Sequence, residues 1–411
     1  MKHYIRYSVL CILISFAGLP KLSAQGWWFR KADFNQTSRT AAVGFCVGTG
    51  GFVGTGYDSS SYKRNFGAYN PSTDTWTSIT SMGGATGSGL SRDAASCFVI
   101  GTKAYVACGQ NSNPFNLDLW EYDAGTDVWT QKANFAGTAR RSAAGFSLGG
   151  KGYITCGQDA AGFKNDLWQY DPTTNSWSAK ASYPGTARRL PVAFTIGTKA
   201  YVGTGDDGVF KGDFYKYDAT ANAWFTVASY GGTPRYGATC FVIGTDAYVG
   251  TGYDNTLSNR KDFWKYNSLT NVWSAVKDFS GTARSNAVGF TIGSFGYVAT
   301  GYDSLTTKDL WVYDPNSNGI DEINKFKESA KIYPNPMSEQ ATLSFDPACL
   351  NSFGRISFSL YDINGRKVRS VNELKSSETT LSRDDLNSGV YIYQFLGDGI
   401  PLASGRIVVT R

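Results

Sequence analysis

One pattern of about fifty residues repeats six times along this chain. Each copy has a small-residue segment ending in Gly, about a dozen variable residues, and an aromatic segment with Tyr-Asp or Tyr-Asn. The glycines are Gly56, Gly109, Gly157, Gly205, Gly252 and Gly301, and the tyrosines are Tyr69, Tyr122, Tyr170, Tyr217, Tyr266 and Tyr313. A period near 50 with several short strands per unit is typical of β-propeller blades. The repeat therefore predicts an all-β chain built around a six-bladed ring.

The copy at residues 140–183 shows how one blade is expected to be built. Residues 143–148 and 153–156 are short strands of small and apolar residues on either side of a Gly-rich turn. Residues 166–170 and 177–180 are aromatic strands joined by turn-forming residues. Small residues in the first two strands and aromatic residues in the last two suit a wedge that is narrow at the ring axis.

The sixth copy lacks the tryptophan that marks the fourth strand in the other copies. A matching segment lies near the N-terminus, where Phe34 follows Trp28 by six residues. The same spacing recurs at Trp129 and Phe135, Trp177 and Tyr183, Trp224 and Tyr230, and Trp273 and Phe279. We therefore expect the N-terminal strand to complete the last blade and to hide both open edges of a propeller that spans residues 25–316.

These repeats resemble kelch repeats, in which a Gly-rich strand precedes a downstream Tyr and Trp. The resemblance covers about 290 residues. The paired glycines of the family are here Thr-Gly or Cys-Gly, as in Thr55-Gly56 and Cys108-Gly109. The resemblance implies a six-bladed kelch-type propeller, in a superfamily that includes galactose oxidase.

The two ends of the chain differ from the repeat. Residues 1–24 have an early positive charge, an apolar run and a small residue before Gln25, which predicts a secretory signal peptide. Residues 317–330 are polar and read as a linker. Residues 331–411 alternate like β-strands and predict a small C-terminal β-sandwich.

This C-terminal segment resembles the sorting domain of the type IX secretion system. The matching residues include Pro334, Asn335 and Pro336 near its start, Gly365 in its centre, and Gly389 and Tyr391 before its last strand. The resemblance implies export across an outer membrane by the type IX machinery, with release or anchoring at the cell surface. A purely structural or glycan-binding sandwich is the alternative.

The composition excludes several kinds of chemistry. The only histidine is His3, inside the predicted signal peptide, so the mature chain has no imidazole for copper or zinc ligation, for a Ser-His-Asp triad or for a Cys-His pair. The resemblance to galactose oxidase therefore does not extend to its copper site, and we expect no metal and no cofactor. The formal net charge is +6 without a basic block, which argues against nucleic acid as a partner. No segment after residue 24 is long and apolar enough for a transmembrane span.

Arginine recurs just before the first strand of every blade. The six residues are Arg39, Arg92, Arg140, Arg188, Arg235 and Arg284. Aspartates recur in the loop after the second strand, on the same face, and before the third strand, where we expect Asp118, Asp166, Asp213, Asp262 and Asp309 to cap the loop backbone. The arginines are expected either to form ion pairs between blades or to face a ligand at one mouth of the channel.

Positions at which the repeats differ on this face are the better candidates for binding. Arg141 and Arg189 are extra arginines, and Tyr236 and Asn286 follow the repeated arginine in later blades. Loop aromatics could stack on a sugar ring or anchor a peptide. The predicted ligand-binding residues are Arg140, Arg141, Arg188, Arg189, Arg235, Tyr236, Asn286, Tyr57, Tyr253 and Tyr302.

Six cysteines follow the predicted signal peptide. A turn centred on Thr102 and Lys103 would place Cys97 opposite Cys108 across the first two strands of a blade, within reach of a disulfide. Buried free thiols are the alternative.

The sequence thus predicts a secreted or surface-displayed propeller without enzymatic activity, which binds a glycan or protein through its Arg-rich face. The alternative is a carbohydrate-active enzyme of the lyase or epimerase type that uses Asp or Tyr at the mouth. A third possibility is a passive spacer without a ligand.

Overall fold

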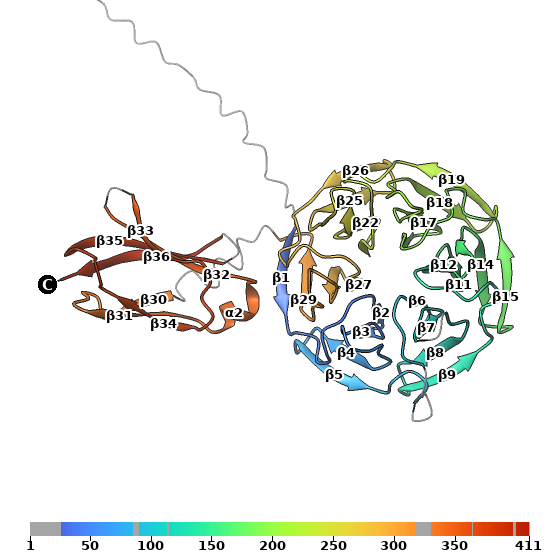
Figure 1. The fold of residues 1–411 in the computed structure, drawn as a ribbon, viewed down its shortest axis with the longest axis horizontal. Helices are drawn as coiled ribbons and strands as arrows, with labels where there is room; N and C mark the ends of the chain where they lie inside the picture. The colour runs from blue at the N-terminus through green and yellow to red at the C-terminus, as the bar shows by residue number, and fades with distance from the viewer. Residues whose placement is uncertain are drawn as a thin grey trace, which may run out of the picture.

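A computed structural model describes residues 26–84, 90–112, 115–317, 330–363, 365–397 and 400–410. The predicted signal peptide and most of the predicted linker lie outside these residues. Within them, six four-stranded antiparallel sheets surround a central axis, and two further sheets form a C-terminal domain (Figure 1). The all-β fold class is therefore confirmed.

The first three sheets of the ring follow the chain in order. The first contains β2 (Val43–Val47), β3 (Gly50–Gly54), β4 (Phe66–Asn70) and β5 (Thr75–Ile79). The second contains β6 (Ser96–Ile100), β7 (Lys103–Ala107), β8 (Leu119–Asp123) and β9 (Val128–Lys132). The third contains β10 (Ala144–Leu148), β11 (Lys151–Thr155), β14 (Leu167–Asp171) and β15 (Ser176–Lys180).

The other three sheets continue round the ring. The fourth contains β16 (Val192–Ile196), β17 (Lys199–Gly203), β18 (Phe214–Asp218) and β19 (Ala223–Val227). The fifth contains β21 (Thr239–Ile243), β22 (Asp246–Gly250), β25 (Phe263–Asn267) and β26 (Val272–Ala275). The sixth contains β27 (Val288–Ile292), β28 (Phe295–Ala299), β29 (Leu310–Asp314) and, from the other end of the ring, β1 (Trp27–Lys31).

Strand β1 closes the ring by pairing with β29, with Trp28 opposite Tyr313, as the tryptophan spacing predicts. Trp28 is buried and its indole N–H donates to the Lys277 carbonyl at 3.1 Å. Gly26 lies two residues before Trp28 and adopts φ +75°, and a Cβ there would meet the Tyr313 hydroxyl at 2.0 Å. Only glycine fits this seam, because the left-handed conformation and the close approach both exclude a side chain.

A turn residue joins neighbouring blades elsewhere in the ring. Asn175 accepts hydrogen bonds from the Tyr170 hydroxyl at 2.8 Å and from the Ala133 backbone N–H of the preceding blade at 2.9 Å. The Trp177 indole N–H donates to the Ala133 carbonyl at 3.1 Å. Asp74, Asp127, Asn222 and Asn271 make the same pair of contacts in their blades. The repeated Tyr and Trp thus hold the rim through side-chain hydrogen bonds as well as packing.

A cycle of backbone hydrogen bonds links the blades nearer the axis. Gly157 donates to the Arg188 carbonyl of the next blade at 2.8 Å, and Gly301 closes the cycle by donating to the Arg39 carbonyl at 2.9 Å. Gly157 adopts φ +94°, and a Cβ there would meet the Arg141 carbonyl at 2.8 Å. The preceding Cys156 tolerates φ +62° without being glycine, so this position of the family's glycine pair is dispensable here.

The C-terminal domain is a sandwich of a three-stranded and a four-stranded sheet. The first contains β30 (Ala330–Tyr333), β31 (Gln340–Phe345) and β34 (Glu378–Ser382). The second contains β32 (Ile356–Tyr361), β33 (Lys367–Val371), β35 (Gly389–Gly397) and β36 (Ile400–Val409). A short helix, α2 (Ala348–Ser352), precedes β32, and the two sheets enclose one apolar core.

The predicted sorting residues lie at the C-terminal end of this sandwich and in its turns. Asn335, between Pro334 and Pro336, donates to the Arg406 carbonyl at 2.8 Å and accepts from the Val408 backbone N–H at 2.9 Å. The buried Tyr391 donates its hydroxyl to the Asn387 carbonyl at 2.9 Å. Gly389 begins β35, and Gly365 adopts φ +78° between β32 and β33. Asn335 thus ties the opening loop to the last strand.

Candidate functional site

The six repeated arginines, which we call the arginine ring, are entirely buried. Arg39, Arg92, Arg140, Arg188 and Arg235 have 0% exposure, and Arg284 has 1%. The prediction that Arg140, Arg188 and Arg235 contact a ligand is therefore wrong. Their side chains point into the blades, where the guanidinium groups donate to side-chain and backbone oxygens of the same blade.

Arg140 shows the arrangement. Its Nη1 and Nη2 donate to the two carboxylate oxygens of Asp166 at 2.5 and 2.8 Å. Nε donates to the Thr138 carbonyl at 3.0 Å and Nη1 to the Cys156 carbonyl at 3.0 Å, while the guanidinium lies 4.9 Å from the Phe135 ring centroid. A planar guanidinium provides this combination of a forked ion pair and stacking, which a lysine does not.

The same ion pair recurs within other blades. The pairs are Arg92 with Asp118, Arg188 with Asp213, Arg235 with Asp262 and Arg284 with Asp309. Each pair joins the segment before the first strand to the segment before the third strand of one blade, so the expected pairing between blades is wrong. The blades are joined by the arginine backbone carbonyls instead.

The repeated aspartates serve the arginine ring rather than the loop backbone. Asp166 also accepts from the Trp168 indole N–H at 2.8 Å. Burial alone would raise the pKa of Asp166, but the Arg140 guanidinium and the Trp168 donor hold it below its usual value. Blade one is the exception, because Asn65 takes the aspartate's place and accepts from Arg39 at 3.1 Å.

A second cycle of six backbone hydrogen bonds closes around the axis, two residues after each repeated arginine. Its members are Ala41, Ala94, Ser142, Leu190, Gly237 and Asn286, all with φ between 49° and 60°. Each backbone N–H donates to the carbonyl of the preceding member, from Ala94 to Ala41 and finally from Ala41 to Asn286, at 2.8 to 3.4 Å. These residues line a cavity of about 110 Å³ on the axis. Asn286 therefore belongs to this inner cycle, and not to the outer slot that Arg141 occupies.

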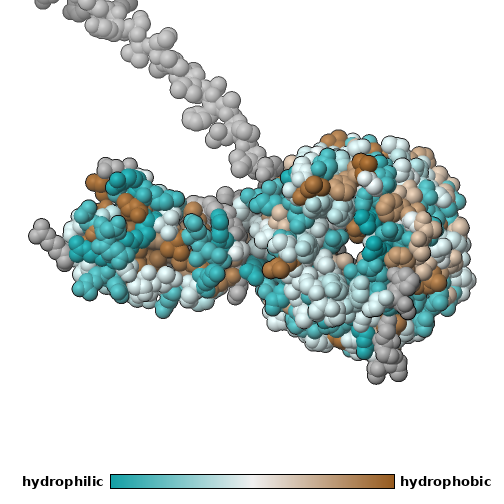
Figure 2. Space-filling view, viewed as in Figure 1, coloured by the Kyte–Doolittle hydropathy of each residue, from teal (hydrophilic) through white to brown (hydrophobic). Residues whose placement is uncertain are grey.

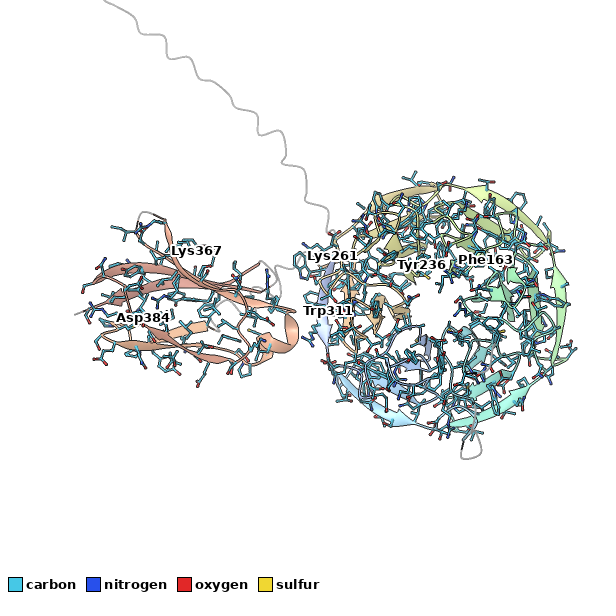
Figure 3. The ribbon with its side chains drawn as sticks, in the orientation of Figure 1. Phe163, Tyr236, Lys261, Trp311, Lys367 and Asp384 are labelled. Atoms are coloured by element: carbon cyan, nitrogen blue, oxygen red, sulfur yellow. The ribbon has the colours of Figure 1, made fainter. Side chains whose placement is uncertain are left out.

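The mouth ring consists of the six residues that directly follow the arginine ring and the six residues paired with them across short bridges. The first set is Thr40, Asp93, Arg141, Arg189, Tyr236 and Ser285. Their partners are Tyr57, Gln110, Gln158, Asp206, Tyr253 and Tyr302. The structure thus gathers Arg141, Arg189, Tyr236, Tyr57, Tyr253 and Tyr302 on one rim. Tyr236 lies near the axis with Phe163 (Figure 3).

The arginines of the mouth ring differ in their partners. Arg189 pairs with the Asp206 carboxylate at 2.9 Å. Arg141 donates instead to the side-chain amide oxygens of Gln110 at 2.7 Å and of Gln158 at 3.1 Å. Arg141 therefore keeps its positive charge without a direct carboxylate partner among the described residues.

Aromatic side chains cluster beside these arginines. The Phe210 ring lies 5.0 Å from Tyr236 and 6.2 Å from Tyr253, and Tyr236 lies 5.6 Å from Tyr253. Phe115 and Phe163 lie 5.8 and 5.6 Å from the guanidinium groups of Arg141 and Arg189. All of these rings are half-buried, so each both packs against its own loop and offers a surface to a ligand.

Asp93 is a mouth-ring residue that the sequence analysis missed. Burial raises its pKa to about 6, although a hydrogen bond with Gln110 and the charge of Arg141 oppose the shift. Its Oδ1 is buried and has no hydrogen-bond partner among the described residues. The signal that could have found it is its position directly after Arg92, the slot that Arg141 fills in the next blade.

The loop aspartates expected at the mouth are mostly occupied by their own loops. Asp58 pairs with Lys63 at 2.5 Å, Asp159 with Lys164 at 2.8 Å and Asp254 with Arg260 at 2.5 Å. Burial would raise the pKa of Asp159, but the Lys164 ion pair and hydrogen bonds lower it to about 2. These carboxylates therefore fix the loops that carry the mouth ring.

The predicted Cys97–Cys108 disulfide is wrong. Both cysteines are free, and Cys97 lies opposite Val106 in the β6–β7 pairing. The turn between β6 and β7 is centred on Gly101 and Thr102, with Gly101 at φ +59°. It lies one residue earlier than the disulfide requires, which moves the residue opposite Cys97 by two positions, from Cys108 to Val106. Cys108 leaves the strand at φ +61° and is completely buried.

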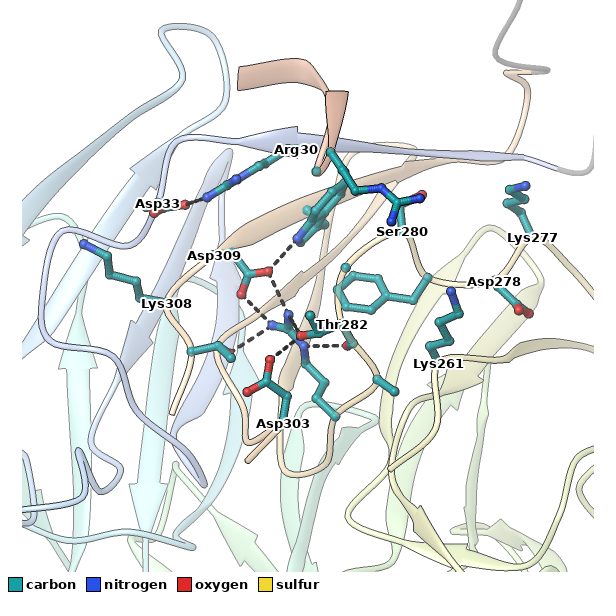
Figure 4. Close-up of a pocket in the computed structure, with 18 of the residues that line it drawn as sticks. Arg30, Asp33, Lys261, Lys277, Asp278, Ser280, Thr282, Asp303, Lys308 and Asp309 are labelled. Carbon is teal, nitrogen blue, oxygen red and sulfur yellow. Dashed lines mark hydrogen bonds and ion pairs between the residues drawn. The ribbon is translucent and has the colours of Figure 1, made fainter. Parts of the chain in front are cut away.

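A groove of about 940 Å³ lies on the outer side of the last blade (Figure 4). It is lined by cations (Arg30, Lys261, Lys277, Lys308) and by anions (Asp33, Asp278, Asp303), and Gly354, Arg355 and Glu373 of the C-terminal domain lie at its edge. None of the predicted ligand-binding residues lines this groove, whereas Arg284 of the arginine ring and its partner Asp309 do. Its mixed charges favour no class of ligand.

On the face that Figure 2 shows, hydrophilic residues surround separate hydrophobic patches. In the part of the chain that the structure describes, no three His, Cys, Asp or Glu side chains gather as ligands of one metal ion. No described helix has the length and apolar character to span a membrane.

Comparisons with known proteins place both parts of the chain. Residues 32–205 match the model of the KLHDC2/KLHL20/DRC7 Kelch-repeats domain, and residues 331–410 match that of the Secretion system C-terminal sorting domain. The solved structure of YjhT aligns with a TM-score of 0.58 and 16% identity, covering 68% of this chain and 95% of that chain. This likeness concerns the fold alone. The search of curated proteins gave no match.

Proposed function

We propose that this chain, which carries kelch repeats and a C-terminal sorting domain of the type IX secretion system, is an exported, non-enzymatic binding protein that takes a glycan or protein ligand at the mouth ring. The sorting domain implies an interaction with the type IX machinery and export to the cell surface or outside. Because the C-terminal domain serves export, the ligand is assigned to the propeller.

One observation carries the proposal: repeated and unrepeated residues separate in space. The repeated arginines are buried in ion pairs within the blades. The residues that follow them differ from blade to blade, and Arg141, Arg189 and Tyr236 are only half-buried on one rim. Side chains that vary around a fixed scaffold and reach solvent together are the usual composition of a binding surface.

Asp93 favours a second candidate function, a carbohydrate-active enzyme of the lyase or epimerase type. A carboxyl group whose pKa lies near 6 is suited to proton transfer near neutral pH. Tyr62 and Arg141 are close enough to act on one another electrostatically, so a base, a hydroxyl and a cation share this part of the mouth ring.

A glycan and protein-ligand screen with the full chain tests the proposal. We expect binding that Arg141→Gln or Tyr236→Ala weakens at least tenfold, about 1.4 kcal/mol. The control Lys180→Gln, on the fourth strand β15 and outside the mouth ring, should leave binding unchanged. Equal binding by all variants contradicts the proposed site.

The two candidate functions separate in the same screen. A binding protein leaves the bound glycan chemically unchanged, as mass spectrometry of the recovered glycan measures. Product formation that Asp93→Asn abolishes supports the enzyme instead. No bound glycan or protein at all supports a passive spacer.

A further inference from the structure

The geometry points to an anion subsite in the mouth ring, in which Arg141 binds the carboxylate of an acidic glycan in competition with the carboxylate of Asp93. This inference rests on the proposed function and names the class of its ligand. It places the subsite between the second and third blades, on residues that are not the same in every blade.

The first argument is the charge of Arg141. Among the described residues its side chain donates three hydrogen bonds, one to the amide oxygen of Gln110 and two to the amide oxygen of Gln158. Arg189, one blade further, is neutralised by the buried carboxylate of Asp206 at 2.9 Å. Amide oxygens orient a guanidinium without cancelling its charge, so Arg141 is held in place for an anion from outside.

The second argument is the position of Asp93. It occupies the slot of Arg141 in the preceding blade and lies close enough for Arg141 to lower its pKa. Gln110 pairs with Asp93 through two backbone hydrogen bonds of 3.0 Å, and its side-chain oxygen accepts from Arg141 at 2.7 Å, so one residue contacts both groups. A ligand carboxylate that reaches Arg141 therefore meets the negative charge of Asp93 when that group is ionised.

The third argument favours a glycan over an acidic peptide. Phe115 lies beside Arg141, and further half-buried aromatic rings follow around the mouth, with Phe163 beside Arg189 and then the cluster of Phe210, Tyr236 and Tyr253. Aromatic faces stack on pyranose rings, and amides hydrogen-bond to hydroxyl groups.

The competition gives the subsite a pH dependence with a defined sign. The groups that face Asp93 are Gln110 on its own blade, Arg141 on the next blade and Tyr62 on the preceding blade. Tyr62 stays neutral, because burial and Asp93 raise its pKa. Asp93 loses its charge as the pH falls through about 6, whereas a sugar carboxylate with a pKa of about 3.5 stays ionised. Affinity for the acidic glycan should therefore rise as the pH falls.

The test measures binding of the full chain to oligogalacturonate and to its methyl ester at about pH 5 and about pH 7.5. We expect oligogalacturonate to bind at least tenfold more tightly than the ester, and more tightly at the lower pH. Arg141→Gln should remove the preference for the acid. Asp93→Asn should give the low-pH affinity at both pH values, and circular dichroism of each variant checks its fold.

Three outcomes overturn the inference. Equal affinity for acid and ester contradicts the anion subsite, although the proposed function survives if both glycans bind. Tighter binding of a poly-glutamate peptide than of any acidic glycan on the array assigns the subsite to peptides. An acid preference that persists in Arg141→Gln places the anion elsewhere, and absence of any glycan or protein ligand removes the proposed function itself.

Discussion

Arg140 and Arg141 are adjacent in the sequence and belong to two different parts of the molecule. Arg140 is completely buried and forms a forked ion pair with Asp166. Arg141 reaches the mouth ring, where its guanidinium donates to the amide oxygens of Gln110 and Gln158 and forms no ion pair with a described residue. The first recurs in every blade and the second does not. Recurrence around a ring thus marks residues that hold a blade together, and its interruptions mark residues free to bind.

The largest expected effect is on stability. Arg140→Ala leaves the partly buried Asp166 without its partner and the Thr138 and Cys156 carbonyls without their guanidinium donor. Breaking such a pair costs about 3–5 kcal/mol. Arg141→Ala should cost less than about 1 kcal/mol, because its partners remain accessible to water. Chemical denaturation of both variants measures the difference, and equal losses would erase the distinction between the two positions.

A smaller effect is expected at Asp93, where stability should depend on pH. Its folded-state pKa of about 6 lies above the ordinary value of 3.8, so the folded state binds the proton more tightly than the unfolded state. The penalty is absent below about pH 4 and grows as the pH rises to 6. Asp93→Asn should therefore stabilise the protein by up to about 2 kcal/mol near pH 7.5 and by little near pH 4. A melting-temperature gain that is equal at both pH values would contradict this assignment.

Blade one offers the reverse substitution, from asparagine to aspartate. Burial lowers the pKa of Arg39 to about 10, with Asp58 opposing the shift, because Asn65 stands where the other blades have aspartate. Asn65→Asp should restore the ion pair and stabilise the protein by about 1 kcal/mol, less than a full pair because Asn65 loses its hydrogen bond to Gln36. Asp166→Asn is the reverse control, and stabilisation by both would show that the carboxylate is irrelevant.

The smallest expected effect is that of a reductant. Because Cys97 and Cys108 do not face each other, reduction should change neither the melting temperature nor the intact mass. A gain of about 2 Da on reduction, the mass of two hydrogens, would show a bridge that the strand register excludes.

The ring could be predicted from the sequence because its determinants are local and repeated. The repeated Trp and Tyr residues predicted the strands. Trp28, the fourth-strand tryptophan that the sixth copy lacks, predicted the pairing of β1 with β29. The arginines could not be assigned by the same reasoning. Whether Arg140 turns inwards depends on Asp166, 26 residues away, and a repeat count does not tell an inward side chain from an outward one.

The errors have physical causes of the same kind. The register of β6 and β7 depends on which two residues form the turn, and Gly101 takes φ +59° where a turn one residue later was expected. Asn286 was assigned to the slot of Arg141 because the slots differ by only one residue. Asp93 was missed because its importance comes from Gln110 and Arg141, which only the folded ring brings beside it.

The most direct test of the account compares Arg140→Lys with Arg141→Lys in the full chain, with melting temperature and glycan binding measured on the same samples. Both changes keep the charge and remove the planar fork. We predict that Arg140→Lys lowers the melting temperature and leaves the affinity of the folded protein unchanged, whereas Arg141→Lys lowers the affinity and leaves the melting temperature unchanged. The reverse pattern, or the same pattern for both variants, would contradict the division between a structural arginine ring and a binding mouth ring.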